Sequence, residues 1–126
     1  MVSSERPDIS LALINDYPVV VEGVAHMLRR HPRLDVVELD SGLLPEQDVD
    51  VVLYDAFAAT GRGTRDVMRL LGEARFRRVV MYTWNVSAQR VDEALAMGMD
   101  GFLSKELSAQ DLGDALVRVH EGERVV

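Results

Sequence analysis

The chain has 126 residues, of which 48% are hydrophobic, and it contains no cysteine. A chain of this size can bury enough apolar surface to fold as one domain without disulfides or a structural metal. Its formal net charge of −7 argues against tight binding of a nucleic-acid backbone by this piece alone, because a polyanion requires an excess of cations on at least one face.

The first residues and the apolar runs predict how the chain is organised. Residues 1–8 are polar and include a proline, which predicts a flexible lead-in. Short apolar runs then recur, most of them followed by a turn and a helical pattern. The predicted strands are residues 9–14, 36–39, 49–54, 79–83 and 101–103. The first, third and fourth are nearly continuous in apolar residues, as in parallel strands covered on both faces, whereas Glu38 marks the second as an edge.

Apolar residues at helical spacing follow four of these strands and should face the sheet. They are Val20, Val24 and Leu28; Val67, Leu70, Leu71 and Ala74; Val91, Ala94 and Leu95; and Leu112, Ala115, Leu116 and Val119. Pro18 stands where a helix starts, and Ser87 is a predicted N-cap. Ser108 and Asp111 have the spacing of a capping box. Residues 41–47 contain a glycine and a proline, so we expect at most one short helical turn there.

Five strands alternating with helices predict a right-handed, doubly wound α/β fold in a single domain, residues 1–126. Sheets of this kind place their sites beyond the carboxyl ends of the strands. The polar residues at these ends are Asn15, Asp16, Asp55, Thr83 and Lys105. Because neighbouring carboxylates repel one another and a hard divalent cation relieves the repulsion, we expect magnesium here. A carboxylate beside that cation can attack a phosphoryl group, while a hydroxyl and an ammonium orient the transferred oxygens.

Each of these residues also has an ordinary structural role. Asp16 and Asp55 are common turn formers, Thr83 suits a strand, and Phe102 suits a core. Lys105 is harder to explain as a solvated surface charge, because the other thirteen basic residues of the chain are all arginine. A compact ammonium and a planar guanidinium are not interchangeable in a tight phosphoryl site, so a single lysine at this position favours a functional role. The placement of all these polar residues at strand ends also favours a functional site over separate structural roles.

Residues 9–123 resemble the receiver domain of bacterial two-component response regulators. The stretch GFLSKELS at residues 101–108 is similar in particular to regulators with a LuxR-type (NarL-type) helix-turn-helix output. The resemblance implies a flavodoxin-like, five-stranded parallel sheet of order 2-1-3-4-5 with helices on both faces. It also implies a cytoplasmic protein without a membrane partner, in keeping with the absence of a secretory leader and of any long apolar run.

The resemblance assigns a role to most of the strand-end residues. Asp55 is the implied phosphoacceptor, Thr83 the switch hydroxyl, Phe102 the switch aromatic and Lys105 the phosphoryl counterion. The implied magnesium ligands are Asp16, Asp55, the backbone carbonyl of Phe57 and, through water, Asn15.

Three departures from the family pattern bear on this site. Asn15 stands where the family usually has an acid, which removes one negative charge from the cation site. The loop after Asp55 lacks the usual Met-Pro-Gly, and Trp84 stands where a small residue is usual. The bulk of Trp84 makes it a candidate for controlling access of a phosphodonor or water.

The expected function is a phosphorylation switch, in which a sensor histidine kinase phosphorylates Asp55 and so controls a C-terminal transcriptional output absent from this chain. Such a domain is not an enzyme, and it reaches DNA only through its output domain. Homodimers are common among the proteins that it resembles. Residues 122–126 are expected to begin the linker to the missing output domain.

Two alternatives remain open at the level of sequence. Asn15, the altered loop and Trp84 lend weight to an atypical receiver that is not phosphorylated and acts as a ligand- or partner-controlled binding module. The other alternative is an unrelated flavodoxin-like enzyme or nucleotide binder. The chain has no complete glycine-rich phosphate loop to support it, because Gly61-Arg-Gly-Thr64 lacks the spacing and the lysine of a P-loop.

Overall fold

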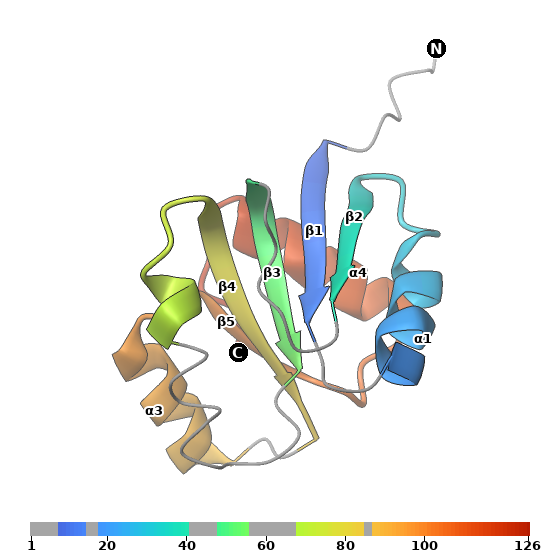
Figure 1. Ribbon diagram of the computed structural model, residues 1–126. Helices are drawn as coiled ribbons and strands as arrows, with labels where there is room; N and C mark the ends of the chain where they lie inside the picture. The colour runs from blue at the N-terminus through green and yellow to red at the C-terminus, as the bar shows by residue number, and fades with distance from the viewer. Residues whose placement is uncertain (1–7, 15–17, 41–47, 56–67, 85–86) are drawn as a thin grey trace.

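Five parallel strands form one sheet with helices on both faces (Figure 1). The structure, a computed structural model, describes residues 8–14, 18–40, 48–55, 68–84 and 87–126. In chain order the elements are β1 (Ile9–Ile14), α1 (Pro18–Leu28), β2 (Leu34–Asp40), β3 (Val49–Asp55), β4 (Phe76–Thr83), α3 (Ala88–Met97), β5 (Gly101–Ser104) and α4 (Ala109–His120). Residues 68–71 are also helical.

The strand order is β2-β1-β3-β4-β5, and every neighbouring pair is parallel. This confirms the predicted doubly wound sheet and places β2 at one edge, as expected. The apolar residues of β1 and β3 explain their central positions, because residues 11–14 and 51–53 are buried. A strand covered on both faces gains stability from apolar side chains at every position.

Two strands are longer than predicted by three residues each, while β3 and β5 each extend one residue further than predicted. β4 begins at Phe76 rather than at residue 79, and β2 spans Leu34–Asp40 rather than 36–39. The start of β4 alternates between buried Phe76 and exposed Arg77, so it lacks the continuous apolar run on which the prediction relied. The first residues of a strand, at the end of the sheet, need an apolar side chain on only one face.

The prediction that Ala74 faces the sheet is wrong. The helical segment ends at residue 71, and Ala74 lies exposed in the turn that leads into β4. Backbone hydrogen bonds from Glu73 N to Leu70 O (3.2 Å) and from Phe76 N to Glu73 O (3.1 Å) close this turn. The alanine therefore follows the helix instead of extending its apolar stripe.

Two apolar layers flank the sheet. α1 and α4 cover one face, where Leu28, Leu112 and Leu116 are fully buried against residues of β1, β3, β4 and β5. Residues 68–71 and α3 cover the other face, where Leu70 and Ala94 are buried. Because burial of each such leucine contributes about 1.5–3 kcal/mol, both layers are needed for stability.

The predicted helix starts are confirmed. α1 begins at Pro18. The Ser87 hydroxyl accepts a hydrogen bond from Arg90 N (3.3 Å), and the Ser108 hydroxyl accepts one from Asp111 N (3.1 Å). Each serine satisfies a backbone N–H that the helix itself leaves without a partner.

Asp8 belongs to the folded domain although it falls within the predicted lead-in. Arg33 donates from Nε to Asp8 Oδ1 (3.0 Å) and from Nη2 to Oδ2 (2.9 Å). The guanidinium holds the pKa of Asp8 below its ordinary value of 3.8, and the carboxylate raises the pKa of Arg33. Residues 1–7 lie outside the described residues.

A histidine lies beneath α4. The His31 ring makes a hydrogen bond between Nε2 and Asp114 Oδ1 (3.1 Å), and its Nδ1 accepts from Arg33 N (3.3 Å). Gly113 packs directly on this ring. With Nδ1 as an acceptor, the neutral ring carries its proton on Nε2 and donates it to Asp114.

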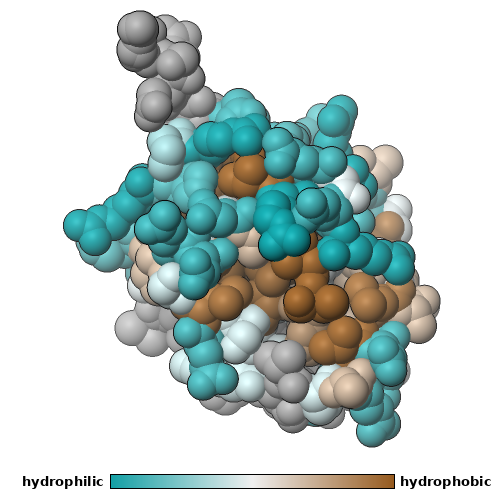
Figure 2. All heavy atoms as spheres, turned by 180° about the vertical axis from the view of Figure 1, so that it is seen from behind, coloured by the Kyte–Doolittle hydropathy of each residue, from teal (hydrophilic) through white to brown (hydrophobic). Residues whose placement is uncertain are grey.

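The C-terminal residues pack against β5. Val125 forms a parallel bridge with Gly101, Phe102 N donates to Val125 O (2.9 Å), and the Val125 side chain is buried. Figure 2 shows the side of the molecule that carries α4, where hydrophobic residues gather in a patch bordered by hydrophilic ones. Residues 122–126, predicted to begin a linker, are therefore anchored to the domain at Val125.

Candidate functional site

The register of the sheet brings the ends of four strands to one rim. Ile14 pairs with Tyr54, Asp55 pairs with Tyr82, and Thr83 pairs with Ser104. Asp55 and Thr83 are thus the last residues of two neighbouring strands, β3 and β4, and Lys105 follows directly after β5. This is the carboxyl edge at which doubly wound sheets hold their ligands.

Part of the predicted site lies outside the described residues. Asn15, Asp16 and Phe57 fall there, and Asp55 is placed by its backbone as the last residue of β3, without a described side chain. Among the residues that the structure does describe, no group of three or more His, Cys, Asp or Glu side chains is arranged to hold a metal ion. The predicted cation site therefore stays a prediction.

Thr83 is the only buried polar residue in the described part of the chain, with 6% of its surface exposed. It closes β4, and its backbone carbonyl accepts a hydrogen bond from Lys105 N at 3.0 Å. Its pairing with Ser104 on β5 fixes the backbone at this position. The residue that carries the predicted switch hydroxyl is thus bonded through its backbone carbonyl to the backbone of the predicted counterion.

Lys105 is half-buried in a turn that its neighbours hold closed. The Ser104 hydroxyl accepts from Glu106 N (3.0 Å), and the Ser104 carbonyl accepts from Leu107 N (3.2 Å). The Lys105 ammonium nitrogen lies over two aromatic rings, 5.8 Å from the ring centre of Tyr82 and 6.0 Å from that of Trp84.

Trp84 is 62% exposed and follows Thr83 at the rim. It lies beside the predicted counterion, and the access role expected for it stays a prediction. Phe102, the predicted switch aromatic, is buried in the apolar layer beneath α3. Because the backbone of Phe102 also contacts Val125, this residue connects the α3 side of the core to the C-terminal segment.

Tyr82, a neighbour of Lys105, was not among the predicted site residues. Side chains two residues apart in a strand lie on the same face, so Tyr82 and Trp84 share the face on which Lys105 continues β5 after Leu103. The burial pattern agrees, since Tyr82 and Leu103 belong to the same apolar layer. The two-residue period relates Tyr82 to Trp84 in the sequence, whereas the contact with Lys105 also depends on the register between β4 and β5.

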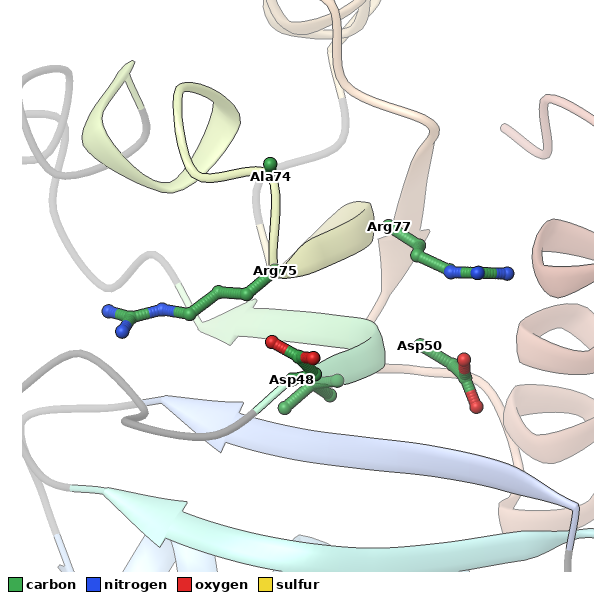
Figure 3. A pocket seen from close by; sticks show the side chains of 6 residues that line it. Asp48, Asp50, Ala74, Arg75 and Arg77 are labelled. Atoms are coloured by element: carbon green, nitrogen blue, oxygen red, sulfur yellow. The ribbon is translucent and has the colours of Figure 1, made fainter.

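A pocket of about 360 Å³ lies at the opposite edge of the sheet, at the amino ends of β3 and β4. Its lining residues are Asp48, Val49, Asp50, Ala74, Arg75 and Arg77. The two arginine side chains extend in opposite directions (Figure 3). Asp50 already accepts from Ser10 N (2.9 Å) and Ser10 Oγ (3.1 Å), which gives it a structural role in joining β3 to β1. We assign no site there.

No helix in the described ranges is long and apolar enough to cross a membrane.

Comparison with known proteins places most of the chain in one family. Residues 11–117 match the response regulator receiver domain. The nitrate/nitrite response regulator NarL of Escherichia coli K12 is 28% identical over 131 residues, an alignment that covers 99% of this chain and 60% of NarL. The transcriptional regulatory protein UhpA of the same organism is 32% identical over 120 residues, covering 90% of this chain and 60% of UhpA.

A solved structure agrees with these relatives. The crystal structure of ChrA, the response regulator of a heme-sensing two-component system, has a TM-score of 0.76 at 27% identity and covers 94% of this chain. The match covers 60% of the ChrA chain. This chain therefore spans about three fifths of the length of these relatives.

Proposed function

The chain belongs to the response regulator receiver domain family, in its LuxR/NarL-type branch, and we propose that it is a phosphorylation switch in which Asp55 accepts a phosphoryl group from a sensor histidine kinase. The observation that carries the proposal is the register of the sheet. It brings Asp55, Thr83 and Lys105 to one rim, with Lys105 N bonded to Thr83 O at 3.0 Å.

In the proposed reaction a carboxylate oxygen of Asp55 attacks the phosphorus of a phosphohistidine. The new O–P bond forms as the P–N bond breaks, and the imidazole leaves with the electron pair. The hydroxyl of Thr83 and the ammonium of Lys105 bind the oxygens of the transferred group and stabilise their charge.

We infer that the reaction requires Mg²⁺. Asp16, Asp55, the carbonyl of Phe57 and, through water, Asn15 would hold the ion, and this set of oxygen donors suits a hard cation. When bound, the ion neutralises the negative charge of the carboxylates and the phosphoryl group. The amide of Asn15 accepts hydrogen bonds from water but carries no charge, so this site binds its cation more weakly than one with two acids.

The proposed response is a shift between two packings. Thr83 moves toward the phosphoryl group, and Phe102 fills the space that it leaves. Both residues are buried, so such a movement must repack the side chains around them. We expect the face formed by α3, β5 and α4 to change shape as a result. A local charge thereby changes the surface of one face of the domain.

We infer that the output is transcriptional. The relatives NarL and UhpA are a response regulator and a transcriptional regulator, and both extend well beyond the matched region. In this proposal the chain acts in the cytoplasm as a signalling domain rather than as an enzyme. A C-terminal helix-turn-helix domain outside this chain contacts DNA, and the receiver is able to form homodimers.

Incubation with magnesium and acetyl phosphate, followed by intact-mass measurement, tests the proposal. We expect a labile adduct with the mass of one phosphoryl group, which Asp55→Asn abolishes. Asp48→Asn is the matched control, because Asp48 is an exposed carboxylate at the other end of the same strand region. No adduct on the wild-type chain, with a known receiver labelled in parallel, would contradict the proposal.

Trp84 gives a separate test of magnesium binding. It is the only tryptophan in the chain and lies at the rim. We expect magnesium to change its fluorescence and Asp16→Ala to remove the change. A response that is the same in both chains would contradict the proposed ligand set.

A second candidate is favoured by the exposure of Trp84. A tryptophan that is 62% exposed beside the expected site is typical of a binding surface. In this alternative the chain is an atypical receiver that is not phosphorylated and is controlled by a ligand or a partner. The mass measurement distinguishes the two functions.

A further inference from the structure

The lone lysine of the chain lies over the rings of two neighbouring aromatic residues. The Lys105 ammonium nitrogen is 5.8 Å from the ring centre of Tyr82 and 6.0 Å from that of Trp84. Both distances lie within the range in which a cation is attracted to the negative face of an aromatic ring. The ammonium is thus attracted toward two rings that flank Thr83 in the sequence, one within β4 and one directly after it.

The backbone explains why these three side chains meet. Tyr82 and Trp84 are two residues apart and share one face of the chain at the end of β4. The hydrogen bond from Lys105 N to Thr83 O (3.0 Å) fixes the lysine opposite this pair. Lys105 therefore lies beside both rings without any change in the ladder between β4 and β5.

The two rings differ in rigidity. Tyr82 is 3% exposed within the apolar layer beneath α1 and α4, so its ring is held by packing. Trp84 is 62% exposed, so its ring meets solvent as well as the lysine. A lysine side chain loses conformational entropy when its rotatable bonds are ordered. Contacts with a rigid ring restrict the side chain in advance, so less entropy is lost when the ammonium binds a phosphoryl group.

We propose that Tyr82 and Trp84 are positioning residues for Lys105, holding its ammonium at the carboxyl edge of the sheet where the phosphoryl group of Asp55 is received. This inference rests on the proposed phosphoryl transfer and adds to it the elements that orient the counterion. It gives Trp84 a role distinct from blocking access, because a positioning residue acts only through the lysine.

The position of the lysine can be measured independently of any phosphorylation. The chain contains one lysine, so protein made with ¹³C-labelled lysine gives one ε-methylene signal in an NMR spectrum. Because the ammonium lies over the aromatic rings, we expect this signal to be shifted upfield from that of a free lysine. Trp84→Leu should move it toward the free position, and Trp84→Phe should retain much of the shift.

The exposure of Trp84 makes this test practical, since replacement of an exposed side chain leaves the core intact. A Lys105 signal that is the same in the wild type and in Trp84→Leu would overturn the positioning role. That result would stand even if Asp55 were readily phosphorylated.

The effect on the reaction is tested with the rate of labelling by acetyl phosphate. An exposed cation–π contact corresponds to a change of about two- to fivefold in rate. We expect Trp84→Leu to slow labelling by that factor and Trp84→Phe to stay close to the wild type. If Trp84 only restricted access, both smaller side chains would speed labelling.

A second pair of variants shows whether Trp84 acts through the lysine. In a Lys105→Met chain, Trp84→Leu should leave the labelling rate unchanged. The same slowing in both backgrounds would overturn the inference. A wild-type chain that takes no phosphoryl group would instead overturn the proposed function, and the NMR signal would still show whether the rings hold the lysine.

Discussion

Gly23 and Gly113 offer the same substitution in two different surroundings. Both lie inside helices, Gly23 in α1 and Gly113 in α4. A methyl group at Gly23 would meet no heavy atom within 4 Å, whereas at Gly113 it would lie 2.5 Å from Cδ2 and 3.1 Å from Cγ of His31. Alanine is favoured over glycine in a helix by about 1 kcal/mol, so Gly23→Ala should raise the free energy of unfolding by about that amount.

At Gly113 the same gain is opposed by overpacking. The His31 ring can move away only by disturbing its hydrogen bonds to Asp114 Oδ1 (3.1 Å) and from Arg33 N (3.3 Å). Overpacking of a well-packed site costs about 1–3 kcal/mol. The gain in helix propensity is the same for both variants. The free energies of unfolding of Gly23→Ala and Gly113→Ala should therefore differ by the cost of overpacking alone, about 2 kcal/mol or roughly 6–10 °C in Tm.

Urea unfolding followed by far-ultraviolet circular dichroism measures both variants. The decisive comparison repeats Gly113→Ala in a His31→Ala chain, where the obstructing ring is absent. There the substitution should become stabilising, as at Gly23. An equal effect of Gly113→Ala in both backgrounds, or a stabilisation of the wild type as large as that of Gly23→Ala, would refute the reasoning.

Three further outcomes follow from described contacts. Ser108→Ala should lower the free energy of unfolding by about 0.5–2 kcal/mol in a denaturant titration, because it removes the acceptor for Asp111 N, while Ser108→Gly should cost only a few tenths. The pKa of Asp8 is lowered in the folded state, so its ion pair contributes stability above pH 3.8 that is lost as the pH falls through the folded value. The stability difference between the wild type and Asp8→Asn should therefore be present at neutral pH and vanish in acid; a difference that persists in acid would contradict the ion pair. Gly101→Ala would place a methyl group 3.2 Å from Val125 O and 3.2 Å from Val119 Cγ2; it should displace the C-terminal segment and speed hydrogen exchange of the Phe102 amide, and unchanged exchange would contradict the packing.

The sequence was sufficient to predict the sheet and its helix starts, because each has a local signal. The strands of the sheet centre are continuous apolar runs, and Ser87 and Ser108 are followed by helical spacing. Where the apolar run was interrupted, the predicted strand was too short. The start of β4 carries Arg77 and Arg78, so only its apolar half was recognised.

The site residues that lie at the ends of strands could be predicted from the sequence. Thr83 and Lys105 were placed at one rim, and the structure joins them through a backbone hydrogen bond. The contact with Tyr82 was missed because it depends on the register between β4 and β5, which no single segment specifies. The packing of Val125 against β5 was not predicted either, because a segment of a few residues is too short to show a hydrophobic repeat.

The bridge between Val125 and Gly101 also bears on self-association. β5 is an edge strand, and an edge presents backbone donors and acceptors to any other extended chain. The C-terminal segment occupies the Phe102 N–H and places the buried Val125 side chain over this edge. Removal of the segment would leave an uncovered strand next to an apolar layer, a template for strand addition by a second molecule. The last residues thus protect the sheet from intermolecular pairing as well as completing its core.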